Sequence, residues 1–259
     1  MTNRDLWLTD AGFSNDAEEL VNGRSLIAEV IKDQAEKGAS KVRALAIDVE
    51  ANQEGRENPT HGVYVCCFCE NGDLLSQWRG YAANGGGVAI GIDSEAFSCV
   101  AGVHNRIGVT SFWKVSYDDD DKRKRVQDVL EFWAGQPDPP EVRAESVAAT
   151  LWLYVPRFKN HSFGAEEVWR LIFSPGPQCP VLPKFRTARG LFMPYLEFAE
   201  VAKNFDNPKG ANAGWLAIKS VCIGPGPYKD VNALSAERLL NSYRINGAKV
   251  NISTIPYRG

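Results

Sequence analysis

Three charged side chains within twelve residues can together support charge-based catalysis. They are the ammonium group of Lys159, the carboxylate of Glu166 and the guanidinium group of Arg170. Glu166 and Arg170 are four residues apart, so they would pair directly on a helix or share one face of a strand. A buried pair of this kind can be purely structural. It can also hold a carboxylate whose charge stabilises a cationic transition state, and both interpretations stay open.

An aromatic pair follows the acidic turn ENGDLL, in the spacing Ser76-x-Trp78-x-x-Tyr81. If this segment is helical, Trp78 and Tyr81 share one face. Two aromatic rings beside a glycine turn would suit the stacking of a flat ring such as adenine or nicotinamide. The alternative is that both rings are core aromatics beneath a turn.

The C-terminal half carries arginines on strand-like segments, and their forked guanidinium groups match the geometry of phosphate and carboxylate. They are Arg186, Arg189 and Arg258. In a chain with a net charge of -3, such a set indicates an anionic ligand. Placement on the surface is the commoner alternative.

A polar group consisting of Asn15, Asp16 and Glu19 stands just before or at a predicted helix start. The simplest interpretation is capping, because Asn or Asp accepts the free amide hydrogens of a helix start. Glu19 lies three residues after Asp16, which is the spacing of a capping box.

Several common catalytic motifs are missing from the sequence. It has no GxSxG, GxxxxGK[ST], GxGxxG or HExxH, which argues against an α/β-hydrolase, a P-loop enzyme and a zinc protease. The three histidines are scattered and the six cysteines lack a second pair at zinc spacing, so we expect buried thiols and no such metal site. The triple glycine Gly85–Gly87 precedes a strand, and it is either a flexible turn or a backbone kept bare for a ligand.

The composition narrows the class of protein further. Across 259 residues, 29 basic side chains face 32 acidic ones, which argues against coating nucleic acid by bulk charge but leaves room for a local basic cleft. No apolar run approaches the ~18 residues of a membrane span, and the N-terminus has no signal region. We therefore expect a cytoplasmic protein that has no membrane partner.

Hydrophobic periodicity predicts both helices and strands. Helices are expected at 18–36, 40–50, 119–133, 141–154 and 233–243, and strands at 63–69, 87–93, 107–117, 168–174, 189–198, 215–224 and 248–254. The run DDDDKRKR at 118–125 resembles a protease tag site. We interpret it as a helix start capped by Asp119 or Asp120, with a basic block that faces solvent.

The order of these elements is strands, then a helical insertion, then strands, which favours an α+β fold over a doubly wound sheet. We expect a single domain over 1–259 with a mixed, largely antiparallel sheet. The helical insertion would occupy about 118–156, and further helices would flank the sheet.

An ordered set of stretches resembles the family catalogued as domain of unknown function 2971, over nearly the whole chain. The stretches are LWLTDAGFSNDAEEL, VCCFCENGDLLSQWRGYAANGGGVAIGID, FKNHSFGAEEVWRLIF, KFRTARGLFMPYLEF, IKSVCIGPG and ISTIPYR. The resemblance carries over onto Asn15, Asp16, Glu19, Ser76, Trp78, Tyr81, Lys159, Glu166, Arg170, Arg186, Tyr195 and Arg258. One departure is Val168, where the family usually has a second acid. Members of the family are mostly bacterial, and its name states no activity.

A more distant likeness is to the ADP-ribosyltransferase fold of toxins that act on DNA or RNA. It implies an NAD-dependent enzyme that transfers or hydrolyses an ADP-ribosyl group, as a toxin or anti-phage effector acting on nucleic acid or protein. Preorganised charge is the large contribution to such a reaction. The residues assigned to catalysis are Glu166, Arg170 and Lys159, and those assigned to NAD are Ser76, Trp78, Tyr81, Arg186, Arg258, Asn15 and Asp16. The first-strand His or Arg that would grip the dinucleotide has no counterpart in this sequence.

Two further hypotheses use the same residues. A metal-dependent phosphodiesterase or nuclease would hold Mg²⁺ with Asp16, Glu19 and Glu166, and Lys159 would stabilise its transition state. A non-enzymatic module would use the arginines to receive a nucleotide or another anionic small ligand. The sequence does not separate these hypotheses, because all of them place their ligand in the same predicted pocket.

Overall fold

The computed structural model describes residues 5–13, 17–53, 62–82, 85–97, 104–188, 190–204 and 218–256. By their contacts these residues form two compact units. Unit 1 draws on Met1–Asp5, Cys69–Val100 and Asn207–Gly259, and unit 2 draws on Leu6–Phe68 and Ala101–Asp206. Two such units can belong to one domain or to two, so the single domain stays a prediction.

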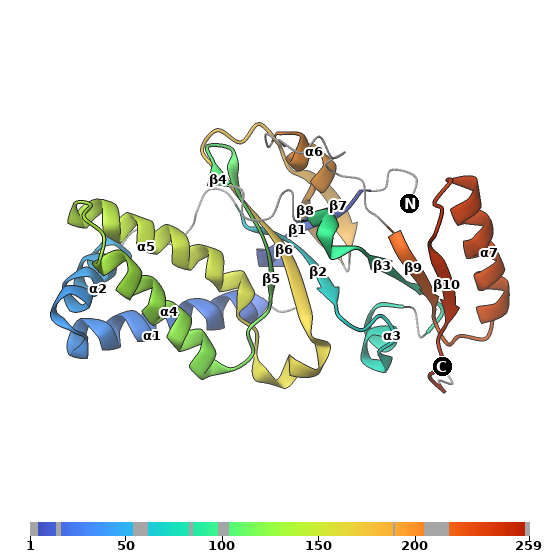
Figure 1. The fold of residues 1–259 in the computed structure, drawn as a ribbon, viewed down its shortest axis with the longest axis horizontal. Helices are drawn as coiled ribbons and strands as arrows, with labels where there is room; N and C mark the ends of the chain where they lie inside the picture. Colours follow the sequence, from blue (N-terminus) through green and yellow to red (C-terminus); the bar gives the residue numbers. More distant parts are fainter. Residues whose placement is uncertain are drawn as a thin grey trace. The chain divides into compact units, whose positions relative to one another are not determined.

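The sheet of unit 2 contains long apolar strands at its centre. Its strands are β1 (Trp7–Asp10), β2 (Tyr64–Cys69), β4 (His104–Asn105), β5 (Gly108–Lys114), β6 (Val168–Pro175), β7 (Lys184–Ala188) and β8 (Leu191–Glu197). Among the described residues they follow the order β4-β5-β6-β2-β1-β8-β7 (Figure 1). Leu171, Ile172 and Phe173 are fully buried, as expected of an apolar run that is covered on both faces.

Most neighbouring strands of this sheet run antiparallel. The pairs β1 with β2, β1 with β8, β4 with β5, β5 with β6 and β7 with β8 all do so. The short strands β1 and β7 were not among the predicted strands. Each is only four or five residues long, and β7 is mostly polar, so neither gives a clear alternating pattern.

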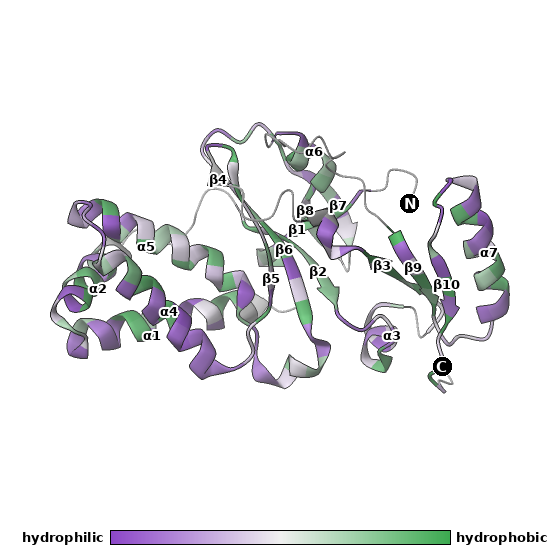
Figure 2. Ribbon diagram, in the orientation of Figure 1, coloured by the Kyte–Doolittle hydropathy of each residue, from purple (hydrophilic) through white to green (hydrophobic). Residues whose placement is uncertain are grey.

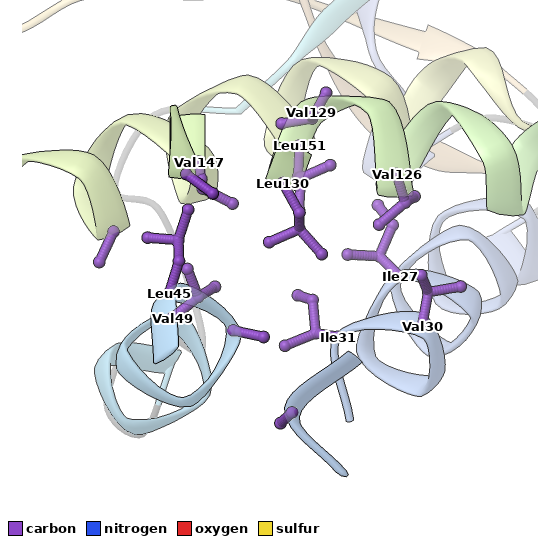
Figure 3. Close-up of a cluster of buried hydrophobic side chains, with 14 of the residues drawn as sticks. Ile27, Val30, Ile31, Leu45, Val49, Val126, Val129, Leu130, Val147 and Leu151 are labelled. Carbon is purple, nitrogen blue, oxygen red and sulfur yellow. The ribbon is translucent and has the colours of Figure 1, made fainter. Parts of the chain in front are cut away.

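The larger helices of unit 2 pack around one apolar core. They are α1 (Ala17–Lys37), α2 (Ser40–Gln53), α4 (Asp119–Ala134) and α5 (Pro140–Tyr154). Figure 3 shows Ile31, Leu45 and Leu130 pointing toward one another from three of these helices. The helical segment predicted at 118–156 is therefore one half of a four-helix cluster, and the two N-terminal helices supply the other half.

Unit 2 is completed by a short helix and by single turns of 3-10 helix. The helix α6 (Phe198–Lys203) follows β8, and the turns are η1 (Ala11–Phe13), η3 (Val155–Arg157) and η4 (His161–Glu166). The turns η3 and η4 connect the end of α5 to the start of β6. They carry the chain through Lys159 to Glu166, two of the predicted site residues.

The acidic run at the start of α4 behaves in part as predicted. The cap is Asp118, one residue before the predicted position, and its side chain accepts a hydrogen bond of 2.8 Å from the Asp121 amide. The first turns of α4 are hydrophilic in Figure 2. The prediction that the basic block faces solvent is wrong for Lys122. Its ammonium group is buried and bonds to Asp119 at 2.6 Å.

Unit 1 has a smaller mixed sheet. Its elements are α3 (Leu75–Tyr81), β3 (Val88–Ile92), η2 (Ser94–Phe97), β9 (Ile218–Ile223), α7 (Lys229–Ser242) and β10 (Lys249–Ile252). Strand β9 pairs in parallel with β10 and antiparallel with β3. Helix α7 connects the two parallel strands, and Val221, Ile223 and Leu240 form their shared core.

The α+β fold with mixed, largely antiparallel pairing is therefore confirmed. The strands are divided between two sheets, whereas the prediction gathered them into one. In the described part of the chain, none of the helices has the length and apolar character needed to cross a membrane.

The four-helix cluster gives a direct test of the packing. Leu130 is fully buried in it, whereas Phe132 lies on the exposed side of the same helix. Leu130→Ala should lower the free energy of unfolding by about 2–5 kcal/mol, because it removes transfer energy and leaves a cavity. Phe132→Ala is the matched control, and urea unfolding of the two variants should separate them clearly. Equal small losses would contradict this packing of α4.

Candidate functional site

Two of the predicted catalytic residues, Lys159 and Glu166, form an ion pair in unit 2. Asn160 begins the turn η4 by accepting a hydrogen bond of 2.9 Å from the Ser162 amide. The turn brings Glu166 back to Lys159, and Nζ of Lys159 lies 2.8 Å from Oε2 of Glu166. The Lys159 and Glu166 side chains are 11% and 21% exposed, so the pair is screened from most of the solvent but remains reachable.

The backbone at Lys159 is fixed by Ser116, which follows β5. The Ser116 amide donates to the Arg157 carbonyl at 2.8 Å, and its carbonyl accepts from the Lys159 amide at 3.0 Å. The Ser116 hydroxyl also donates to the Asp121 carboxylate at 2.6 Å. One residue therefore joins the end of a strand, the first turn of α4 and the segment that carries Lys159.

Arg170 and Glu166 stand in neither of the two predicted relations. Glu166 ends η4, Arg170 lies within β6, and Glu167 between the two elements has φ 44° and ψ 54°. This left-handed conformation is uncommon for a residue other than glycine, and it turns the chain between the two positions. Arg170 is buried, and its Nη1 donates to the Pro156 carbonyl at 2.6 Å.

Tyr117 lies among these charged groups and was not singled out by the sequence. Its hydroxyl accepts a hydrogen bond of 3.0 Å from the Val168 amide. Burial raises the pKa of Tyr117, the Val168 bond and the charges of Lys159 and Arg170 lower it, and the charge of Glu166 raises it. The structure thus brings all three predicted catalytic residues near one phenol. A lone tyrosine after a strand carries no sequence signal that could have revealed this.

A polar cavity of about 330 Å³ lies beside Lys159 in unit 2. It is bounded by α1, the start of α4 and the segment around η4. Its lining residues are Asn22, Gly23, Ser25, Leu26, Glu29, Asp119, Lys122, Arg123, Phe158, Lys159, Asn160 and His161. Lys159 is the predicted site residue that lines the cavity, whereas Glu166, its ion-pair partner, is not among the lining residues.

The cations of this cavity all have carboxylate partners. Arg123 donates to both carboxylate oxygens of Glu29 at 2.9 Å, and Lys122 bonds to Asp119 at 2.6 Å. The hydrogen bond from Lys122 is the main reason that the pKa of Asp119 lies below its ordinary value. The lining contains three cations and two carboxylates, with His161 in addition.

Arg186 is the predicted arginine that falls within the described residues. It lies on β7, and its Nη2 donates to Oγ1 of Thr9 on β1 at 2.9 Å. Arg189 and Arg258 lie outside the described residues, as do Asn15, Asp16 and the side chain of Glu19. The grouping of the arginines into one set therefore stays a prediction, and so does the capping of α1 by Asp16.

The aromatic pair of unit 1 is divided between core and surface. Trp78 is only 2% exposed, and its indole N–H donates to Asp73 at 2.7 Å, which matches the core alternative. Tyr81 is 66% exposed on the same short helix, and Ser76 is also exposed. Asp73 accepts a second hydrogen bond of 2.6 Å from the Ser253 hydroxyl, so it connects α3 to the segment after β10.

The triple glycine packs against a second glycine pair in unit 1. The amides of Gly224 and Gly226 donate to the carbonyls of Gly87 and Gly85, both at 2.9 Å. A Cβ atom at Gly224 would collide with the Gly85 carbonyl. This contact explains the glycine at 224, while Gly85 has φ 86° and a Cβ atom at Gly87 would collide with Ala82. The sequence prediction did not include these contacts.

Comparison with known proteins adds a family to this geometry. The model of a family described as protein of unknown function, DUF2971, matches residues 77–171. The match includes Trp78, Tyr81, Lys159, Glu166 and Arg170, and it confirms the DUF2971 resemblance over that span. Neither a curated protein nor a solved structure matches the chain.

The Trp78 hydrogen bond allows the core and ligand-stacking roles to be separated. Trp78→Phe removes the N–H donor and leaves Asp73 short of a partner, which should lower the stability of unit 1 by about 1–3 kcal/mol. Tyr81→Phe changes an exposed ring and should leave the unfolding midpoint unchanged. Urea unfolding of both variants is the measurement, and a fully stable Trp78→Phe protein would contradict the structural role.

Proposed function

We propose that unit 2 binds an anionic small molecule, of the nucleotide class, in the cavity beside Lys159. The observation that carries the proposal is that Lys159 lines this cavity while Glu166 holds its ammonium group in place at 2.8 Å. A fixed cation at the wall of a polar cavity offers a phosphate group a charge-assisted hydrogen bond without much further ordering.

The size and charge of the cavity support a ligand of this class. Its volume of about 330 Å³ lies at the lower end of the range for small-molecule sites, which suits a mononucleotide-sized group. The lining has one more cation than carboxylates, in a chain whose net charge is -3. A bound phosphate would compete with Glu29, Asp119 and Glu166 for their cations, so we expect moderate affinity that falls with added salt.

Titration calorimetry tests this binding with ADP-ribose and AMP as the probes. Lys159→Gln should weaken binding by about tenfold or more, because a hydrogen bond to a charged group contributes about 1.5–3 kcal/mol and 1.4 kcal/mol is a factor of ten. Arg123→Gln, which changes a second lining cation on a different element, should weaken it as well.

Lys124→Gln is the matched control for these variants. Lys124 follows Arg123 on α4, its side chain is largely exposed, and it pairs with Asp128 away from the cavity. Binding by this variant should equal that of the wild type. If all three variants bind the probes equally well, the ligand does not occupy this cavity.

Glycosyl transfer from NAD is the specific reaction that we propose for this site. It is favoured by the Glu166 carboxylate, which is oriented by Lys159 and remains partly exposed. In the reaction the bond between nicotinamide and ribose C1′ breaks, and nicotinamide leaves with the electron pair. An acceptor oxygen or nitrogen, or water, bonds to C1′ and loses its proton. Glu166 would stabilise the cationic ribose during this exchange, as preorganised charge does in other enzymes.

Release of nicotinamide from NAD, followed by chromatography, tests the reaction. Glu166→Gln should reduce the rate by about 100-fold or more, because it removes the negative charge that faces the cationic centre. Glu167→Gln is the matched control, since its exposed carboxylate lies 3.5 Å from Lys114. No release by the wild type, or equal release by both variants, would exclude the reaction while leaving the binding proposal intact.

A separate cleavage assay addresses the metal-dependent phosphodiesterase hypothesis. Among the described residues, no group of three or more His, Cys, Asp or Glu side chains stands ready to hold a metal ion. The described partner of Glu166 is a lysine, which Mg²⁺ would have to displace. Cleavage of a nucleic acid that EDTA abolishes would favour this hypothesis over glycosyl transfer.

A further inference from the structure

Arg186 crosses one face of the unit 2 sheet from its edge strand. The register pairs Arg186 with Met193 and Lys184 with Tyr195 on β8, and Tyr195 with Thr9 on β1. These side chains therefore share one face, on which the guanidinium group reaches the Thr9 hydroxyl at 2.9 Å.

The guanidinium group is held between two aromatic rings. Its Cζ lies 5.2 Å from the ring centroid of Trp7 and 6.0 Å from that of Tyr195, within the range of cation–π contacts. The two rings lie against each other with centroids 4.7 Å apart. Tyr195 is buried, but Trp7 is 47% exposed, so this cluster opens to solvent.

The positive charge of Arg186 has no carboxylate partner in the part of the chain that the structure describes. Its Nε is buried and makes no hydrogen bond there. The neighbouring thiol of Cys66 does not compensate the charge, because burial raises the pKa of Cys66 to about 12. Partly buried cations are normally paired, since removing them from water is otherwise costly.

Lys184 shows the usual arrangement two residues away. Its ammonium group lies 2.6 Å from Glu197 and 3.7 Å from Glu200, and these carboxylates are therefore engaged by Lys184. Arg186 is held on the same face by a neutral hydroxyl and by rings. Unlike Lys184, Arg186 therefore has a positive charge that an added anion could still pair with.

We propose that Arg186 and Thr9 form an anion site for a phosphate or carboxylate group of a ligand, separate in its residues from the cavity beside Lys159. The guanidinium has five N–H donors and suits two oxygens of one anion. The Thr9 hydroxyl accepts from Arg186, so its own hydrogen can be donated to a third oxygen of a phosphate or to one of the two oxygens of a carboxylate. Trp7 forms the exposed wall, against which the rest of the ligand would lie.

Affinity for inorganic phosphate and for acetate, measured by calorimetry at constant ionic strength, tests this site. Arg186→Gln should weaken binding of the favoured anion by about tenfold or more. Arg186→Lys keeps the charge but loses the two-oxygen geometry, so it should fall between the wild type and Arg186→Gln. Stronger binding of phosphate than of acetate would assign the site to phosphate-bearing ligands, and the reverse order would assign it to carboxylates.

Arg123→Gln separates this site from the cavity. Phosphate should give two separate binding events: Arg186→Gln should lose the one at Arg186, and Arg123→Gln should weaken only the one in the cavity. A single binding event that Arg186→Gln leaves unchanged and Arg123→Gln weakens would overturn the Arg186 site and would support the cavity alone. Unchanged anion affinity in Arg186→Gln would also overturn the Arg186 site. So would a wild type that binds neither anion, together with an Arg186→Gln variant that only unfolds at a lower temperature. In that last case Arg186 is a structural cation.

Discussion

The hydrogen bonds of Ser116 are the constraint on which the arrangement of unit 2 depends. This residue pairs in parallel with Phe158, between the end of β5 and the segment after η3. Its hydroxyl reaches Asp121, which also accepts a bond of 2.8 Å from Arg125. Sheet, helix cluster and connecting segment are therefore fixed to one another at one point. The backbone of Lys159 is thereby fixed at the wall of the cavity.

Several cations lie partly or fully inside unit 2, and each is accommodated differently. Lys122 bonds to a carboxylate, and Arg170 bonds to a backbone carbonyl. Arg157 lies over the rings of Trp113 and Tyr154, with centroid distances of 4.0 and 4.5 Å. Burial lowers the pKa of Arg157, but a guanidinium group titrates so high that it stays charged near neutral pH. Unit 2 thus contains positive charges in its interior. A purely apolar core would have been sufficient if stability were the only requirement.

The sequence was sufficient for those elements whose pattern is local. The helices α1, α4 and α5 and the strands β2 and β6 carry strong periodicity or long apolar runs, and they appear close to their predicted bounds. It was not sufficient for the four-helix cluster, because contacts between α1 and α4 join segments about a hundred residues apart. Nor could periodicity reveal the positive φ of Glu167, because nothing about glutamate favours that conformation.

The candidate site shows the same division. Residue type and spacing singled out Lys159, Glu166 and Arg170, but they did not predict the ion pair between Lys159 and Glu166. That pair forms because η4 brings Glu166 back to Lys159, which only the folded backbone shows. The buried position of Lys122 and the proximity of Tyr117 depend on distant segments, so they carried no signal in the sequence.

The tag-like sequence at the start of α4 acquires a practical meaning from its structure. The run of aspartates followed by lysine reads as a cleavage tag, yet Lys122 is buried within a regular helix. A protease needs its target in an extended, accessible form, which this segment offers only when the helix opens. The rate of cleavage after Lys122 would therefore report the population of an open state of α4. This makes cleavage at Lys122 a measure of local unfolding at the wall of the cavity.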